Sequence, residues 1–273
     1  MNFQKLSIPE KMMNFKEIIF KVENGIAVIT LNRPDIRNAI SGIDIIREME
    51  EACGIVNQDM TIKVMILTAA DPAFSSGGNI KDMAEKKGMF TGSPTEVMES
   101  YRRNIQRIPL AVHHMETPTI AAVNGPAIGA GCDLALMCDM RVASEKAAFG
   151  ETFINIGLVP GDGGAYFLPR IVGMAKACEL SFTGEIINAS QALKIGLIND
   201  MVPHDQLMEQ VRKLAEKIAS KPSAALRMTK RLLYMGQKHG LKELLEQSAA
   251  YQALCHYSDE HQQALSTLLK KIK

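Results

Sequence analysis

Short apolar runs alternate with helical segments from residue 17 to about residue 204, and this alternation limits the chain to a few architectures. Residues 17–32 predict two strands that turn at Asn24-Gly25, a dipeptide typical of hairpins. The other elements follow from apolar runs and helical periodicity: strands at 64–70, 119–125 and 140–144, and helices at 41–58, 96–115 and about 131–136. Strands separated by helices favour an α/β fold with crossover connections.

The chain beyond Asp205 has a different character, because it is amphipathic, nearly all helical and without a strand signal. We therefore predict a core at 15–204 and a helical region at 205–273. Residues 81–95 are charged, and we interpret them as a loop with some mobility. The first 14 residues have no apolar stretch typical of a signal peptide, and we expect them to be a loose leader.

Composition narrows the classes of partner and compartment. A net charge of +1 gives no general attraction for nucleic acid or for an anionic membrane. No run of 18 apolar residues is present, so we expect no membrane partner and, by default, a cytoplasmic location. The five cysteines form no C-x-x-C pair, which indicates a reducing compartment without a disulfide framework or a bound metal.

Two glycine-bearing turns each follow a predicted buried strand. The first is FSSGGNI at 74–80, and the second is NGPAIGAGCD at 124–133. Glycine lets the backbone approach a ligand closely, and the start of a helix favours negative charge. A phosphate-binding loop and a nucleophile elbow are both excluded, since neither G-x-x-x-x-G-K-[ST] nor G-x-S-x-G occurs. Two amide-bearing turns without a nucleophile suit the binding of an oxyanion.

Several motifs resemble the enoyl-CoA hydratase/isomerase (crotonase) superfamily, in order, over roughly residues 15–270. They are LNRPDIRNAIS (31–41), AFSSGGNIKDM (73–83), the stretch from AAVNGPAIGAGCDLALMCD to AYFLPRIVG (121–173), TGEIINASQALKIGLINDMVP (183–203) and KPSAALRMTK (221–230). The resemblance implies a ββα spiral core with C-terminal helices that cover the acyl pocket and build trimers, or hexamers as dimers of trimers. It also implies an acyl-CoA thioester as substrate and no separate cofactor.

By the same resemblance, the backbone amides of Gly78 and Ala130 would hold the thioester oxygen as it becomes negative. The cations Arg33, Arg37 and Lys81 match basic positions of the family and would face the phosphates of coenzyme A. Further substrate-binding candidates lie in or near the turns: Ser76, Asn79, Ile80 and Phe153. Lys230 and Arg231 are candidates for the adenosine 3′-phosphate of a neighbouring subunit.

The acidic residues follow the family only in part. Asp133 occupies the position of the first catalytic glutamate, and we expect the helix dipole to keep it ionised, as a base requires. The position of the second glutamate holds Phe153, which cannot transfer a proton. Glu151 and Asp162 are the neighbouring acids that could replace it. Asp162 could instead simply cap the helix that follows.

The resemblance implies the addition of water to a trans-2-enoyl-CoA, with Asp133 activating the water or protonating Cα. A double-bond isomerase is the nearest alternative, because a single acid suffices for it. A non-catalytic acyl-CoA binder or an RNA-associated protein is a second alternative, although neutral charge argues against RNA. A protease on the same fold is a third alternative, but no serine–histidine pair fits it.

Overall fold

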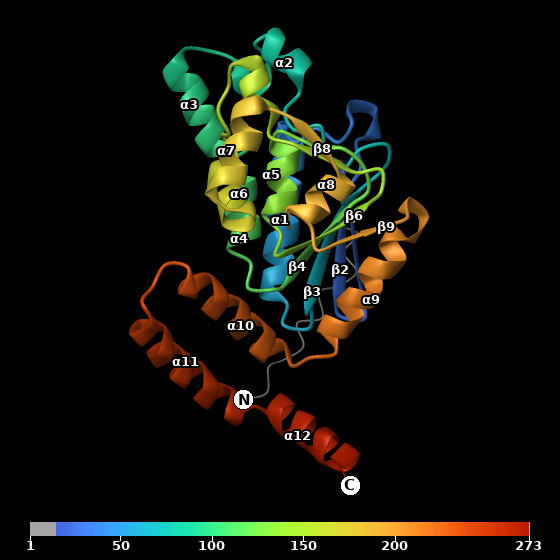
Figure 1. Ribbon diagram of the computed structural model, residues 1–273, viewed down its shortest axis with the longest axis vertical. Helices are drawn as coiled ribbons and strands as arrows, with labels where there is room; N and C mark the ends of the chain where they lie inside the picture. The colour runs from blue at the N-terminus through green and yellow to red at the C-terminus, as the bar shows by residue number, and fades with distance from the viewer. Residues whose placement is uncertain (1–14, 273) are drawn as a thin grey trace.

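A six-stranded sheet forms the centre of the molecule, in the order β1-β2-β3-β4-β6-β9. The computed structural model describes residues 15–272, so the predicted leader lies outside the described residues. Strands β1 (Ile18–Glu23) and β2 (Ile26–Leu31) are antiparallel, which confirms the predicted hairpin. The other strands run parallel to β2: β3 (Val64–Ala69), β4 (Thr119–Val123), β6 (Met140–Ser144) and β9 (Asp200–Val202). The α/β prediction is confirmed (Figure 1).

Helices cover both faces of this sheet, and the alternation along β2 shows why. Ala27, Ile29 and Leu31 pack on one side with α1 (Ile43–Gln58), whereas Ile26 and Val28 pack on the other. The first side also carries α4 (Arg107–His113), α5 (Ala130–Leu136), α6 (Gly164–Val172), α7 (Met174–Thr183) and α8 (Ala189–Lys194). The second side is covered by α9 (Leu207–Ala219) through Leu207, Val211 and Ala215. Successive strand residues point to opposite faces, so both faces need apolar residues.

A second, three-stranded sheet lies beside the first and was not predicted. Its order is β5-β7-β8, with β5 at Ala127–Ile128, β7 at Ala148–Gly150 and β8 at Ile186–Asn188. Strands of two or three residues are too short to display a period of two, so the sequence pattern does not reveal them. This sheet fixes the second glycine-bearing turn, because β5 lies within it.

The segment between β3 and β4 differs from its prediction. Residues 81–95 are not one loop, since α2 (Ile80–Ala84) and a 3-10 turn at Gly88–Phe90 lie in this region. The single helix predicted at 96–115 is divided into α3 (Pro94–Arg103) and α4. The break falls at Asn104, whose backbone angles are not helical. Three further 3-10 helices lie elsewhere: Pro34–Ile36, Thr152–Ile156 and His204–Gln206.

The C-terminal helices extend away from the body of the molecule. Helices α10 (Ser223–Gly236), α11 (Leu241–His256) and α12 (Asp259–Ile272) lie at the end of the molecule opposite α2 and α3, whereas α9 packs on the sheet (Figure 1). The change in packing therefore comes after α9, while the division at 205 stays a prediction. Among residues 15–272, no helix combines the length and the apolar character needed to cross a membrane.

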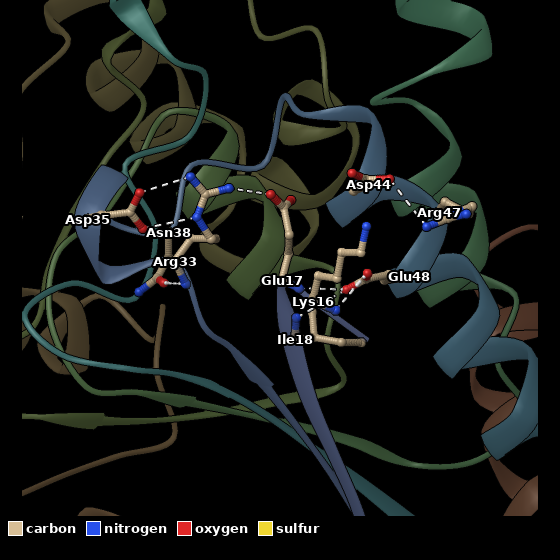
Figure 2. A network of polar contacts seen from close by, with 9 residues as sticks. All are labelled: Lys16, Glu17, Ile18, Arg33, Asp35, Asn38, Asp44, Arg47 and Glu48. Atoms are coloured by element: carbon tan, nitrogen blue, oxygen red, sulfur yellow. Dashed lines mark hydrogen bonds and ion pairs between the residues drawn. The ribbon is translucent and has the colours of Figure 1, made fainter. Parts of the chain in front are cut away.

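Glu48 on α1 fastens the start of the first strand. Its buried carboxylate accepts backbone hydrogen bonds from Lys16 (2.9 Å), Glu17 (2.8 Å) and Ile18 (3.2 Å), as Figure 2 shows. A carboxylate has enough lone pairs for three donors, and such charge-assisted bonds are stronger than neutral ones. The edge strand is thus held to the helix as well as to β2.

We expect Glu48→Gln to lower the free energy of unfolding by about 2–3 kcal/mol, because the amide group replaces one acceptor by a donor. Urea unfolding followed by circular dichroism measures the change. Glu51→Gln, at an exposed position of the same helix, is the matched control and should change stability little. Equal stability of the two variants would show that these bonds do not hold β1.

Candidate active site

The two glycine-bearing turns come into direct backbone contact. The Ser75 amide donates to the Pro126 carbonyl (3.1 Å), and the Ile128 amide donates to the Ser75 carbonyl (3.0 Å). Gly77 has a φ of 78°, and a Cβ there would lie 2.6 Å from the Ile128 oxygen and 2.9 Å from the Ala130 nitrogen. Only glycine permits this approach. The structure therefore brings Gly78 and Ala130 to neighbouring positions.

A cavity of about 60 Å³ lies at this junction. Its walls are mainly apolar: Ile80, Met83, Met89, Phe90, Tyr101, Ile105, Ile128, Phe153, Ile156 and Leu158. Gly78 and Ala130 also line it, and within residues 15–272 neither amide donates a hydrogen bond to the chain. Ala130 is the first residue of α5, where the amide has no partner within the helix. Two unpaired donors thus lie beside one apolar cavity.

One carboxyl group, that of Asp162, lines the cavity. Asp162 lies in the turn before α6 and is only 3% exposed. Its Oδ1 has no hydrogen-bond partner among the described residues. Burial, and then the negative charge of Asp133, raise the pKa of Asp162 to about 7. A carboxyl group of this kind can both accept and return a proton near neutral pH.

Asp133 and Glu151 lie behind this wall and do not line the cavity. Asp133 is fully buried on α5, and Glu151 is 2% exposed just after β7. Both carboxyls meet at the start of α6, since a Cβ on Gly164 would overlap Asp133 Oδ1 and lie 2.7 Å from Glu151 Oε2. The predicted role of these two residues in proton transfer stays a prediction, but a direct one would need a path through the wall.

Burial works against the expectation that the helix dipole keeps Asp133 ionised. Burial, and then the charge of Glu151, raise the pKa of Asp133 well above its usual range. The amides of Gly164 and Asp162 face Asp133 and oppose this rise, although neither makes a hydrogen bond of full geometry. Burial also raises the pKa of Glu151. Loss of hydration outweighs the dipole because α5 is short and its first turn is covered.

Phe153 lies in the 3-10 helix Thr152–Ile156 and contributes a cavity wall. Its ring edge would lie 3.8 Å from a Cβ on Gly129, the residue before Ala130. Phe153 is thus an apolar wall near one of the two amides.

A profile of the enoyl-CoA hydratase/isomerase family matches residues 21–273. The chain belongs to this family. The resemblance found in the motifs is thereby confirmed. A crotonyl-CoA hydratase of Syntrophomonas wolfei is 34% identical, over 96% of this chain and 98% of that one. A trans-2-decenoyl-[acyl-carrier-protein] isomerase of Streptococcus mutans is 26% identical, over 95% of this chain and 97% of that one.

Solved structures of this family have the same fold. An enoyl-CoA hydratase from Bacillus anthracis superposes with a TM-score of 0.87 at 29% identity, over 94% of this chain and 97% of that chain. The crotonase-like architecture implied by the motifs is therefore confirmed.

The predicted phosphate-binding cations differ in their surroundings. The Arg33 guanidinium pairs with Glu17 and Asp35, so a phosphate would have to compete with two carboxylates (Figure 2). Arg37 and Lys81 are exposed beside the first turn, and the Arg37 carbonyl accepts the Ser76 amide (2.9 Å). Neither Arg37 nor Lys81 forms an ion pair among the described residues.

The candidates on α10 are engaged elsewhere. Lys230 is buried, with its Nζ 2.8 Å from Asp139 and 3.1 Å from the Thr117 carbonyl, so its prediction as a phosphate ligand is wrong. Arg231 lies 3.1 Å from Glu116.

The other predicted residues of the first turn either line the cavity or support the backbone beside it. Ser76 and Ile80 line the cavity. The Asn79 side chain instead accepts the Lys81 amide (3.1 Å) and caps α2. Sequence reasoning did not find Met83, Met89, Phe90 and Tyr101 as cavity residues. For Met83, Met89 and Phe90 the available signal was an apolar side chain within a charged segment, whereas Tyr101 lies in the helix predicted at 96–115.

Proposed function

We propose that this family member adds water to the double bond of 2-enoyl-CoA thioesters. The observation that carries the proposal is the set of two unpaired amides and one carboxyl group on a single apolar cavity. The Gly78 and Ala130 amides would donate to the thioester oxygen, which becomes negative when C3 is attacked. Preorganised donors of this kind stabilise the enolate without reorganisation at the moment of reaction.

Asp162 would handle the proton in this reaction. As the water oxygen bonds to C3, the Asp162 carboxylate takes a proton from the water. The C2=C3 electron pair becomes the C1=C2 bond of the enolate, and the C=O electron pair moves onto the thioester oxygen. The carbonyl then re-forms as C2 takes the proton from Asp162. One water is added, and Asp162 returns to its ionised form. Because one carboxyl group acts from one side, both additions occur on the same face of the substrate.

Binding of the coenzyme A portion would involve the exposed cations Arg37 and Lys81 beside the first turn. The reaction uses groups of the protein and the thioester, so we propose that acyl-CoA is the substrate and that no cofactor takes part. The relatives named as hydratases support this substrate class. The five free cysteines favour a reducing, cytoplasmic compartment, and a role in lipid metabolism accords with a fatty acyl substrate.

We also propose that α10–α12 join copies of the chain into a trimer or a hexamer. These helices expose many large apolar side chains: Leu233, Leu241, Leu245, Leu254, Leu265, Leu268 and Leu269. Such exposure is more than a solvated helix needs.

The test is incubation of the full-length protein with crotonyl-CoA. We expect loss of the enoyl thioester absorbance and a product heavier by one water. Double-bond isomerisation is the second candidate, favoured by the single carboxyl group at the cavity, and it would move the double bond of a 3-enoyl-CoA without a change in mass. Tight binding of acyl-CoA with no turnover of either substrate would contradict both activities.

A further inference from the structure

Three carboxyl groups converge from three elements of the structure. Asp133 comes from α5, Glu151 follows β7, and Asp162 precedes α6. All three are at most 3% exposed. Within residues 15–272, none of them forms an ion pair with a lysine, arginine or histidine. A buried cluster of acids without a cation is costly, so its charge has to be reduced in another way.

The cluster divides into a pair and a single group. Asp133 and Glu151 meet at Gly164, where the missing side chain leaves room for both carboxyls. Two carboxylates that lie this close cannot both be ionised at low cost, so such a pair retains one proton. Asp162 is separate from the pair because it lines the cavity, and its unpartnered Oδ1 is buried.

We propose that Asp133 and Glu151 share one proton behind Asp162 and act as positioning residues, whose remaining negative charge sets the pH range in which Asp162 exchanges protons. This inference rests on the proposed function of Asp162. The pair does not touch the substrate, and its effect is electrostatic. It would explain why a cavity with a single carboxyl group can work near neutral pH, since a negative charge behind Asp162 favours its protonated form.

The groups that face the cluster from the surrounding elements are few. Burial, and then the negative charge of Asp162, raise the pKa of Tyr101 on α3, so the phenol is neutral at pH 7. Cys132 on α5 faces Glu151, and burial raises the pKa of its thiol well above the usual range. Neither group supplies a positive charge. Among residues 15–272, the charge that acts on Asp162 is therefore that of Asp133, one member of the pair.

The first test is a titration of the resting protein by NMR, with ¹³C-labelled aspartate and glutamate side chains. Asp133→Asn, Glu151→Gln and Asp162→Asn assign the three carboxyl signals. We expect the Asp133 and Glu151 signals to move together in a shared step, with one proton retained by the pair at pH 7, while Asp162 titrates separately. Full ionisation of both members of the pair at pH 7 would overturn the proposal.

The second test is the pH dependence of kcat/KM for crotonyl-CoA. In Asp133→Asn/Glu151→Gln the pair is neutral, so Asp162 should ionise more easily and the acidic limb should move to lower pH by about one unit or more. Glu145→Gln, at an exposed position after β6, is the control and should leave the limb in place. A lower rate with an unmoved limb would mean that the pair is only structural, which contradicts the proposal.

The two tests also separate this inference from the proposed function. The NMR titration requires no turnover, so it gives a result even if crotonyl-CoA is not hydrated. A shared proton with no hydratase activity would leave the pair established and remove the proposed reaction. Hydratase activity together with independent titration of Asp133 and Glu151 would support the proposed reaction and overturn the shared proton.

Discussion

Asp162→Asn should lower kcat for the hydration of crotonyl-CoA by about 10²–10⁴, which is the usual contribution of general acid–base catalysis. Asparagine keeps the size of the side chain but cannot accept the proton of the attacking water. Within the part of the chain that the structure describes, Asp162 is the one carboxyl group that lines the cavity, so no neighbour can take over directly. Spectrophotometric measurement of kcat and KM gives the result, and Asp205→Asn, at an exposed position, is the control.

The pH dependence of the wild-type protein follows from the same group. Asp162 acts as a base in its ionised form, and burial together with the charge of Asp133 raises its pKa to about 7. The rate should therefore fall as the pH drops below about 7. This acidic limb should disappear from the residual activity of Asp162→Asn. A limb that remains in the variant would belong to another residue and would contradict the assignment.

Stability provides a check that this loss is chemical. The pKa of Asp162 is higher in the folded protein than in the unfolded chain, so the folded state binds more protons and stability decreases as pH rises between the two values. The cost of the buried charge is complete above about pH 7, and asparagine removes it. Asp162→Asn should thus retain only its residual activity yet be no less stable at pH 8, as thermal unfolding can measure.

Local patterns in the sequence were sufficient for the main elements of the core. Asn24-Gly25 between two apolar runs is typical of a hairpin turn. The runs at β3 and β4 are too short and too apolar for surface helices. The strands of the second sheet could not be found in this way, because two or three residues carry no period. Asn104 divides α3 from α4 through its backbone conformation, which side-chain pattern does not encode.

The glycine-bearing turns of the site could be predicted, because residue type determines what their backbone can do. The roles of the acidic residues were harder to predict, because they depend on burial. The two glycine-bearing turns were recognised from residue type and spacing, and they do meet. The order of importance among the acids was not accessible, because it depends on which carboxyl faces the cavity and which lies behind it. Asp133 was predicted as the main catalytic acid from its position in the family motif, whereas the packing of α5 against α6 places it away from the cavity. The pairing of Arg33 with Glu17 was likewise not predicted, since the two residues are distant in sequence.

Ala130→Pro tests the other half of the site, the backbone donor. Proline has no amide hydrogen, and at the first position of a helix its ring is tolerated because that amide has no partner within the helix. The variant should therefore fold while one of the two donors to the thioester oxygen is lost. Removal of one such donor typically lowers kcat by about 10²–10³, and we expect a loss of this size for crotonyl-CoA.

Ala130→Gly is the matched control for this variant, since it keeps the amide and frees space, and its kcat should stay within about tenfold of the wild-type value. Crowding by the proline ring is the competing explanation of a loss, and the affinity for a saturated thioester separates the two. An amide that acts mainly on the developing negative charge contributes little to the binding of butyryl-CoA, so its Kd should change far less than kcat. If Kd weakens by the same factor as kcat/KM, the ring blocks the cavity and the Ala130 amide has no special role in the transition state. If kcat is unchanged, the thioester oxygen is held elsewhere, and the contact between the two turns has a purpose other than catalysis.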